Sequence, residues 1–329
     1  MIAPFHGKRV LVAGGLGFIG SNLAARLVAL GARVTLVDNL EKNSGANAFN
    51  ILGVKPYLNL LKGDIRNTRK AADAVRGQEI LFNLIGLTSH FDSMQAPEKD
   101  LEINCHAQLS LLEACRLYNP TIRIVFSGTR QIYGTPRFLP VDESHPIDPV
   151  DINGIHKWAG EHYHRVYSKV YGLPVTILRL TNTYGPRMRV RDERQTFLGL
   201  WIRQSLENLP LTIFGNGHQF RDFNYVEDVL DAMLLAASHS IAIGQTYNLG
   251  GRKTFSLNHL AQLLIEMSGS KAGFQNIPFC PERKAIDIGS YQANFTRISK
   301  SLGWKPQISL TDGLRLTLQF YRKHKKYYW

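Results

Sequence analysis

An apolar run, a glycine-rich turn, a helical pattern and a second apolar run follow one another between residues 8 and 38. Residues 8–13 are rich in valine and leucine, and the second run, 34–37, ends at an acid, Asp38. The turn between them places glycine at every third position, at Gly14, Gly17 and Gly20. This order predicts two parallel strands joined by a helix, which is the opening unit of a layered α/β sheet.

The glycines and the acid together suit a dinucleotide. Gly14 permits a tight turn, Gly17 lets the backbone approach a pyrophosphate, and Gly20 lets the helix pack closely on the strand. The helix N-terminus offers free N–H groups and a partial positive charge to the phosphates. A carboxylate at Asp38 would accept hydrogen bonds from ribose hydroxyls and repel a 2′-phosphate, so we expect NAD rather than NADP. The alternative is a structural turn that binds no ligand.

The composition is that of an ordinary globular chain. Its 329 residues suffice for a large core or two lobes, and 44% hydrophobic with 20% charged residues is typical. No apolar run approaches the roughly 18 residues of a membrane span, and the first strand starts too early to follow a signal peptide. The three cysteines have neither metal-like spacing nor the number for a disulfide framework. We expect a cytoplasmic protein with no integral membrane association and no metal.

A formal net charge of +13 could attract nucleic acid, an anionic membrane surface or an anionic small molecule. Residues 322–329 add a basic, aromatic tail. The sequence lacks the interleaved basic and aromatic platform that single-stranded nucleic acid needs. We therefore expect no nucleic-acid partner, and we interpret the tail as solvated, on a protein that handles phosphorylated ligands.

Strand-like and helix-like segments alternate through the first 180 residues. The predicted strands are 10–13, 34–37, 57–62, 80–85, 122–126 and 175–180. The predicted helices are 19–30, 68–75, 97–118 and 154–171. This alternation predicts an α/β fold, a doubly wound parallel sheet with helices on both faces and ligands at the carboxyl ends of its strands.

After residue 182 the pattern becomes irregular, with predicted helices ending near 208 and spanning 226–238 and 256–267. We interpret residues 1–182 as an NAD-binding Rossmann domain, to which 226–250 returns. Residues 183–329 would then form mainly a smaller, discontinuous substrate lobe. A cleft between two such lobes is a usual place for a small ligand.

Motifs along nearly the whole chain resemble the extended short-chain dehydrogenase/reductase family, in particular its nucleotide-sugar epimerases and dehydratases. The glycine turn with Asp38 looks like the family's NAD site, Gly63-Asp64-Ile65 like its adenine-holding segment, and 83–86 like its cofactor-lining strand end. The resemblance implies these cofactor-binding residues: Gly14, Gly17, Phe18, Ile19, Gly20, Asp38, Asn39, Asp64, Ile65, Leu84, Ile85, Gly86 and Lys157.

The same resemblance implies a substrate site. Residues 126–134 are similar to the family's Ser-Ser-Ser/Thr-x-x-Val-Tyr-Gly strand end, which puts Thr129 at the position of the catalytic hydroxyl. Residues 179–187 and 214–226 are similar to segments that approach the sugar diphosphate, where an arginine fork can pair two oxygens at once. The implied ligands of a nucleotide sugar, with a UDP-sugar as the family's prior, are Asn182, Arg187, Arg221, Arg283 and Asp287.

The family's central device is Tyr-x-x-x-Lys on one helix face, where the lysine lowers the pKa of the tyrosine so that the phenolate takes a proton from a sugar hydroxyl. Lys157 is in place here, but the tyrosine position holds Asn153, whose amide cannot ionise. Three accounts are open. Another group supplies the base, the protein binds NAD and a nucleotide sugar without a redox step, or Asn153 is an engineered change that traps a complex. The candidate bases are His90, Tyr133, His156 and a water on Thr129, with Asn153 positioning the substrate or that water.

Arg130 and Gln131 stand where the family's 4,6-dehydratases carry the acid that eliminates water. Neither side chain is an ordinary proton donor or acceptor, so dehydration by that route is disfavoured. The resemblance therefore favours an NAD-dependent epimerase that oxidises the sugar transiently to a ketone and reduces it again. Thr129 would hydrogen-bond the reacting oxygen, and Lys157 would hold the nicotinamide ribose.

Two other functions stay open: a non-redox NAD or nucleotide-sugar binding or regulatory protein, and another nucleotide-sugar modifying enzyme of the dehydratase or decarboxylase type. Family members commonly pair through two long helices, which correspond to 97–118 and 154–171 here. We therefore expect a homodimer.

Overall fold

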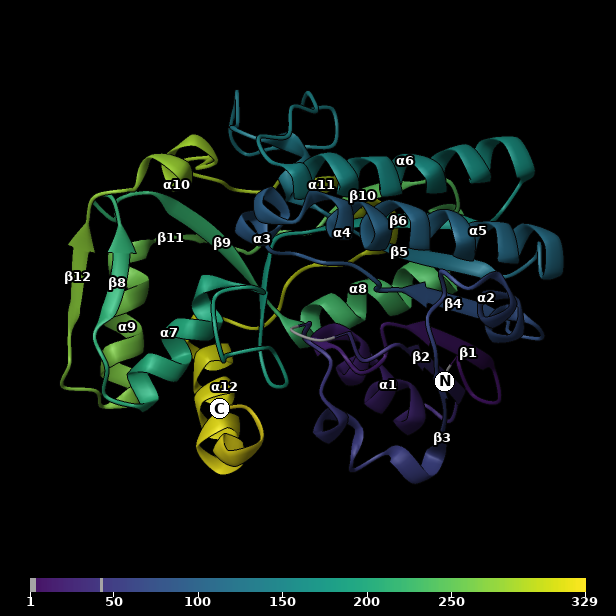
Figure 1. Cartoon of the computed structure of the whole chain (residues 1–329), viewed down its shortest axis with the longest axis horizontal. Coiled ribbons are helices and arrows are strands. Elements are labelled where there is room, and N and C mark those ends of the chain that lie inside the picture. Colours follow the sequence, from purple (N-terminus) through teal and green to yellow (C-terminus); the bar gives the residue numbers. More distant parts are fainter. Residues whose placement is uncertain (1–3, 42–43) are drawn as a thin grey trace.

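The computed structural model describes residues 4–41 and 44–329. Its centre is a parallel seven-stranded sheet in the order β3-β2-β1-β4-β5-β6-β10 (Figure 1). The strands are β1 (Arg9–Ala13), β2 (Arg33–Asp38), β3 (Leu58–Lys62), β4 (Ile80–Asn83), β5 (Arg123–Thr129), β6 (Val175–Leu180) and β10 (Thr246–Asn248). The predicted doubly wound α/β fold is confirmed.

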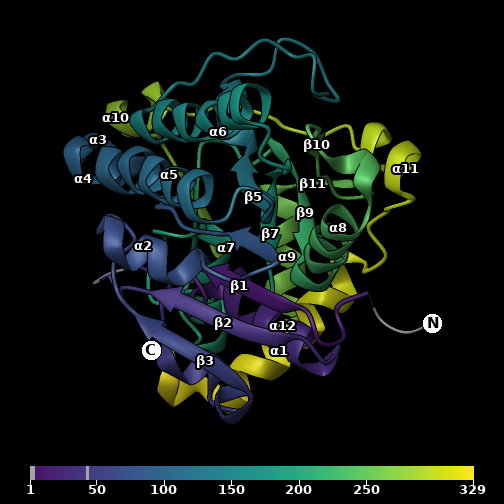
Figure 2. The ribbon, with the colours of Figure 1, turned by 90° about the vertical axis from the view of Figure 1, so that its right-hand side faces the viewer.

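Helices cover both faces of this sheet (Figure 2). On one face lie α2 (Thr68–Val75), α5 (Ala107–Tyr118) and α6 (Ile152–Tyr171), and on the other lie α1 (Phe18–Ala29) and α8 (Val226–Ser238). Because both faces are covered, the central strands are buried on both sides. This burial explains their continuous valine and leucine runs.

Two sequence predictions need correction. The helix predicted over 97–118 is in three parts: α4 (Pro97–Leu101), a π-helical turn (Glu102–His106) and α5. The predicted strand 80–85 ends at Asn83, because the chain then leaves the sheet to run along the cavity described below. A short helix, α3 (His90–Gln95), was not predicted, and Ser89 caps its N-terminus by accepting a hydrogen bond from the Asp92 N–H.

The rest of the chain builds two small sheets and their helices, on the left of Figure 1. One sheet joins β7 (Asn182–Tyr184), β9 (Phe220–Tyr225) and β11 (Thr254–Ser256), and the other joins β8 (Leu211–Phe214) and β12 (Phe274–Ile277). Their helices are α7 (Phe197–Leu206), α9 (Leu257–Ser268), α10 (Pro281–Ala285) and α12 (Leu310–His324), whereas α11 (Thr296–Leu302) packs beside β10 at the edge of the central sheet.

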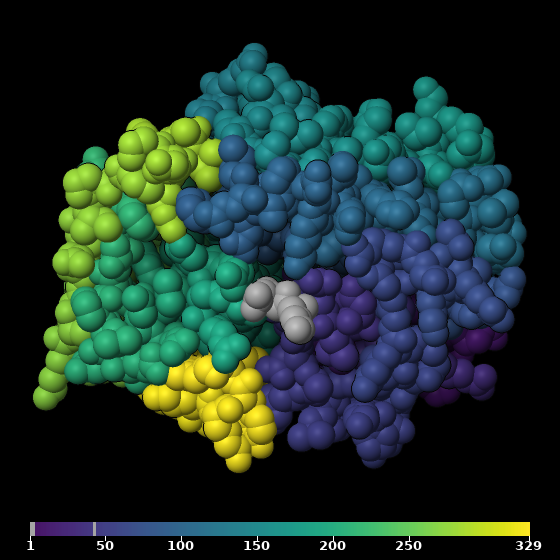
Figure 3. Space-filling model, viewed as in Figure 1, coloured from purple at the N-terminus to yellow at the C-terminus, as the bar shows by residue number. Residues whose placement is uncertain are grey.

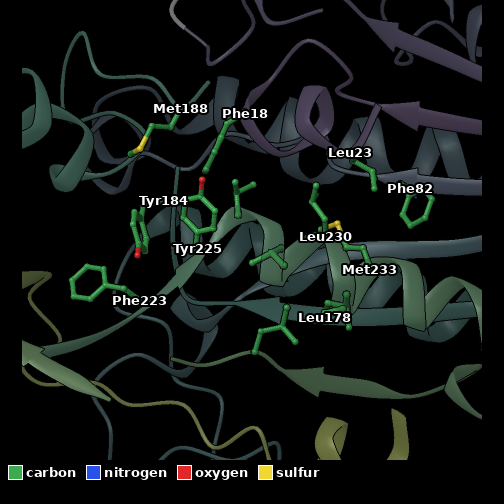
Figure 4. Packing of buried hydrophobic residues seen from close by; sticks show 14 of the residues in the cluster. Phe18, Leu23, Phe82, Leu178, Tyr184, Met188, Phe223, Tyr225, Leu230 and Met233 are labelled. Atoms are coloured by element: carbon green, nitrogen blue, oxygen red, sulfur yellow. The ribbon is translucent and has the colours of Figure 1, made fainter. Parts of the chain in front are cut away.

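One hydrophobic core runs from the central sheet into these smaller sheets (Figure 4). Phe82 and Leu178 of the sheet belong to the same buried cluster as Leu230 of α8 and as Tyr184 and Phe223. Because side chains of both parts pack in one continuous core, this packing fixes the position of the central sheet relative to the smaller sheets. The cleft between the two parts therefore has walls that are held by the core.

The tail was predicted to be solvated, and this interpretation is wrong for its aromatic end. The Tyr327 ring stacks on Phe49 with 3.7 Å between centroids, and the Tyr328 hydroxyl donates to Asn50 Oδ1 at 2.5 Å. Figure 3 shows the yellow C-terminal residues lying against the purple N-terminal region. Tyr328 is 8% exposed while Tyr327 keeps 42% of its surface exposed, and the preceding Lys325 and Lys326 can keep their ammonium groups at the surface.

Candidate functional site

A cavity of about 1180 Å³ opens at the carboxyl ends of the sheet strands and extends between the two parts of the chain. Every residue predicted to bind the cofactor lines it, from Gly14 to Lys157. From the other side come Asn182, Arg221, Arg283 and Asp287, four of the five residues predicted for the substrate. The fold thus brings two sets of residues that are far apart in sequence to one hollow.

The glycine turn leads directly into α1. Gly14 has φ of +80°, a conformation that favours glycine. A Cβ on Gly20 would stand 2.3 Å from the Gly14 carbonyl oxygen, so helix and turn approach too closely for any other residue. Gly17 at the N-cap gives α1 no side-chain cap, which leaves its first N–H groups available to an anion. These features fit a dinucleotide pyrophosphate.

Asp38 ends β2 at the cavity. Its Oδ2 accepts from the Leu16 N–H and its Oδ1 from the Leu40 N–H, both at 2.9 Å. Burial raises the pKa of Asp38, and these two backbone hydrogen bonds oppose the rise. The carboxylate is thereby fixed where ribose hydroxyls could donate to its remaining lone pairs.

Asn39 and Asp64 meet beside Asp38, where Asn39 Nδ2 donates to Asp64 Oδ2 at 3.0 Å. The Arg66 guanidinium, 2.6 Å from Asp64, lowers the pKa of that carboxyl to about 2. Asp64 is therefore ionised throughout the neutral range. Ile65 follows it and is an apolar residue of the cavity wall.

Lys157 lies on α6, only 6% exposed. Its Nζ is 2.0 Å from where a Gly86 Cβ would stand, so a side chain at residue 86 would have to displace the Lys157 ammonium group. Burial lowers the pKa of Lys157 to about 8, although the charge of Asp100 opposes the change. The ammonium is thus mostly protonated at neutral pH and lies beside Gly86 at the cavity.

Thr129, Gln131 and His90 form a chain of polar contacts along the cavity. Thr129 Oγ1 donates to Gln131 Oε1 at 3.1 Å, and Gln131 Nε2 lies 2.7 Å from His90 Nε2 and 2.8 Å from His90 Nδ1. The other ring nitrogen of His90 contacts Asp151 Oδ2. Burial would raise the pKa of Asp151, but its hydrogen bonds with His90 and Gly154 bring it below the usual value. His90 is therefore an imidazole oriented by a carboxylate.

Asn153 is fully buried, and among the described residues it is not part of the cavity wall. Its Nδ2 donates to the Leu87 carbonyl at 2.9 Å and to Asp100 Oδ2 at 2.8 Å. Asp100 also accepts from Asn104 Nδ2 at 2.9 Å and contacts His156 Nδ1 at 2.8 Å. The amide thus helps to hold a buried carboxylate, and His156 is engaged in the same cluster.

Tyr133 lies in the core and not at the cavity. Its hydroxyl donates to Asn248 Oδ1 at 2.7 Å and accepts from Arg179, whose guanidinium pairs with Glu161 at 2.7 Å. Burial raises the pKa of Tyr133 to about 12. This placement removes Tyr133 from the candidate bases.

Of the five residues predicted to bind substrate, four lie at the cavity and one does not. Arg221 Nη2 lies 3.7 Å from Asp287 Oδ1, and Asn182 Nδ2 donates to the Asp222 carbonyl at 2.9 Å. Arg283 lines the cavity paired with Glu193.

Arg187 points elsewhere. Its φ is +70°, and its guanidinium donates to the Asn50 carbonyl at 3.1 Å and to Asn22 Oδ1 at 2.5 Å. It ties the loop after β7 to α1 and contributes nothing to the cavity wall among the described residues. The assignment of Arg187 to the substrate is therefore not supported by its position.

Three residues of the site were not predicted as functional: Asp100, Gln131 and Asp151. Asp100 and Asn104 are four residues apart, the spacing that puts two side chains on one helix face. Asp151 accepts from the Gly154 N–H at 2.7 Å as the N-cap of α6, a role that Asp before a helix often indicates. Its contact with His90, 61 residues away, has no local signal.

Among residues 4–41 and 44–329, no cluster of three or more His, Cys, Asp or Glu side chains is arranged to hold a metal ion. In the same part of the chain no helix has the length and apolar character needed to cross a bilayer.

Comparison with known proteins gives consistent matches. The model of the NAD dependent epimerase/dehydratase family matches residues 10–250. The UDP-glucose 4-epimerase of Mycolicibacterium smegmatis is 30% identical over 315 residues, which are 95% of this chain and 98% of that protein. An epimerase structure from Methanothermobacter thermautotrophicus superposes with a TM-score of 0.92 at 26% identity, covering 99% of this chain and 95% of that one. A UDP-glucose 4-epimerase from Thermotoga maritima, solved with UDP-glucose, has a TM-score of 0.88 at 29% identity, covering 96% and 99%.

Proposed function

Because the chain belongs to the NAD dependent epimerase/dehydratase family, we propose that it is an NAD-dependent nucleotide-sugar epimerase. The observation that carries this proposal is the single cavity shared by the glycine turn, Asp38, Thr129 and Lys157 on one side and Arg221 on the other. A cofactor and an anionic substrate can meet there at the end of β5. A UDP-sugar is the proposed substrate, supported by similarity to epimerases of UDP-glucose.

The residues around the glycine turn suit NAD, which when bound accepts hydride from a sugar carbon and returns it to the opposite face of the resulting ketone. Asp38 would accept from the adenosine ribose, and the N–H groups of α1 would face the pyrophosphate. Lys157 would donate to the nicotinamide ribose and supply positive charge beside it. Thr129 would hydrogen-bond the reacting oxygen.

We propose His90 as the group that takes the proton from the sugar hydroxyl. With Nδ1–H donating to Asp151, Nε2 would keep its lone pair as an acceptor at the cavity, where the Gln131 amide nitrogen lies 2.7 Å from Nε2 and 2.8 Å from Nδ1. A substrate hydroxyl would replace this amide as the donor, pass its proton to Nε2 as hydride leaves carbon, and regain it when hydride returns. Asn153 would serve indirectly, by holding Asp100 near Lys157.

The arrangement disfavours dehydration. Gln131 is bonded to Thr129 and His90, and its amide does not titrate. No carboxyl group therefore stands directly after Thr129 to donate the proton that departing water needs. These residues therefore support epimerisation, in which the sugar loses no atoms.

The test is anaerobic incubation of the protein with NAD and a panel of nucleotide sugars, followed by absorbance near 340 nm and by NMR of the recovered sugars. A transient absorbance with an inverted stereocentre is expected. Tight binding of both ligands without absorbance change or inversion would instead favour a non-redox binding protein. Activity gained only on Asn153→Tyr would identify a disabled or engineered catalyst.

We further propose that residues 1–182 with 226–250 form the cofactor domain, and that the protein is a cytoplasmic homodimer. Helix α6 supports pairing, because Ile155, Val166, Val170 and Tyr171 expose 41–63% of their surface. The three free cysteines suit a reducing compartment. Size-exclusion chromatography with light scattering tests the dimer.

A further inference from the structure

Arg130 follows Thr129 directly and lines the same cavity. Its guanidinium lies over the Tyr291 ring, 4.9 Å from the centroid. Nη2 is 3.4 Å from Asn182 Oδ1, at the limit of a hydrogen bond, and Nη1 is buried with no hydrogen-bond partner among the described residues. A buried cationic donor without an acceptor is costly, and such donors in a cavity wall usually serve a ligand.

The carboxylates nearest Arg130 are committed elsewhere. Asp222 Oδ1 accepts from Thr181 Oγ1 at 2.7 Å, and its Oδ2 accepts from the N–H groups of Gly251 and Ala293. Asp151 is held by His90 and caps α6, while Asp287 faces Arg221. Their charges moderate the cost of burying Arg130, but in the described part of the chain none makes an ion pair with it.

Arg221 is a second guanidinium in this region, close enough for the charge of Arg130 to contribute to lowering its pKa, after burial itself, to about 10. Arg221 donates to the carbonyls of Phe220 and Gly289 and lies 3.7 Å from Asp287. It stands on the side where we place the diphosphate. Arg130, next to Thr129, stands at the reacting end of the site, where a diphosphate already bound at Arg221 would present the sugar.

We propose that Arg130 recognises an anionic substituent on the sugar itself, so that the substrate is a nucleotide-linked uronic acid and not a neutral hexose. A carboxylate on the sugar would accept two hydrogen bonds from the planar fork of Arg130 and neutralise its charge. A neutral hydroxyl group could take only part of the donor capacity and would leave the cation unpaired. This inference rests on the proposed binding of a nucleotide sugar in the cavity.

The experiment measures binding before turnover. Isothermal titration of the NAD-loaded protein with UDP, UDP-glucose and UDP-glucuronate gives three dissociation constants for the wild type, for Arg130→Gln and for Arg130→Lys. The matched control is Arg137→Gln, which removes the same charge from an exposed arginine outside the cavity. Each variant's NAD affinity reports whether it has folded.

The wild type should bind UDP-glucuronate about 10- to 100-fold more tightly than UDP-glucose, the size expected of a charged, bidentate pair. Arg130→Gln should abolish that preference while changing the affinity for UDP and UDP-glucose by less than about threefold, and Arg130→Lys should retain part of it. Arg137→Gln should keep the full preference.

Equal wild-type affinities for the two sugars overturn the inference without any variant. An equal loss for all three ligands in Arg130→Gln also overturns it, because Arg130 would then bind the diphosphate. A preference for the uronate without epimerisation would support the role of Arg130 and refute the proposed function. Epimerisation of neutral sugars without a preference for the uronate would support the proposed function and refute the role of Arg130. If UDP, UDP-glucose and UDP-glucuronate all failed to bind, both would be refuted.

Discussion

Lys157 holds an ammonium group where water is largely excluded, and its removal should make the folded protein more stable. Burial lowers its pKa from 10.5 to about 8. One pKa unit corresponds to about 1.4 kcal/mol. The difference of roughly 2.5 units therefore lowers the free energy of unfolding by about 3 kcal/mol at a pH where Lys157 is protonated in both the folded and the unfolded chain. Lys157→Met should therefore raise the free energy of unfolding near pH 7 by up to about 3 kcal/mol while abolishing turnover.

The pH dependence of unfolding checks the sign of the effect that Lys157 has on stability. Between about pH 8 and 10.5 the unfolded chain binds a proton at Lys157 that the folded chain has lost, so this residue makes the wild type relatively more stable as pH rises. The advantage of Lys157→Met should shrink by about 2 to 3 kcal/mol between pH 7 and pH 10. Urea unfolding at both values measures it, with Lys169→Met, an exposed lysine on the same helix, as control.

A difference between Lys157→Met and wild type that does not change with pH would refute this reasoning. It would mean that the ammonium is as well solvated as in the unfolded chain. A change of the same size in Lys169→Met would refute it too, since the effect would then not depend on burial.

Three further perturbations test other parts of the structure. Asp151→Asn keeps an oxygen for the helix cap but turns an amide N–H toward His90 Nδ1, so kcat should fall about 10²- to 10⁴-fold with little change in Tm; an unchanged kcat would exclude His90 as the base. Gly20→Ala places a Cβ 2.3 Å from a carbonyl oxygen and should weaken NAD binding at least about tenfold by calorimetry, whereas Gly53→Ala, with open space around it, should not. Glu161→Gln leaves its buried arginine partner unpaired and should cost about 3 to 5 kcal/mol in urea unfolding; a loss below about 1 kcal/mol would contradict the pairing.

Much of the fold followed from local patterns. Strands 34–37 and 175–180 and helices 68–75 and 226–238 were predicted within a residue of their bounds at each end. Hydrophobic periodicity and helix signals act over a few residues, so a single sequence contains them in full. The continuous pattern over 97–118 concealed the π-helical turn, because one extra residue in a turn changes the backbone without interrupting the apolar face.

Sequence motifs predicted where the residues of the candidate site lie along the backbone, but not where their side chains point. The residues of the glycine turn, Asp38, Thr129 and Lys157 were named from sequence and do line the cavity. Tyr133 and Arg187 stood in equally recognisable motifs, yet one is hydrogen-bonded in the core and the other ties a loop to α1. A motif gives an approximate place along the backbone, whereas the packing around a side chain decides which way it points.

The sequence by itself determined the doubly wound sheet, the turn for a dinucleotide and the absence of an ionisable side chain at Asn153, because each is a property of residue type and short spacing. Only the tertiary structure decided which groups could compensate for that absence. His90 and Asp151 are 61 residues apart, and Asn153 and Asp100 are 53. Arg130 Nη1 has no acceptor among the described residues because folding has committed the acids around it to other groups. Hydrogen bonds and ion pairs act over a few ångströms in space, and the chain reaches such distances between remote residues only by folding.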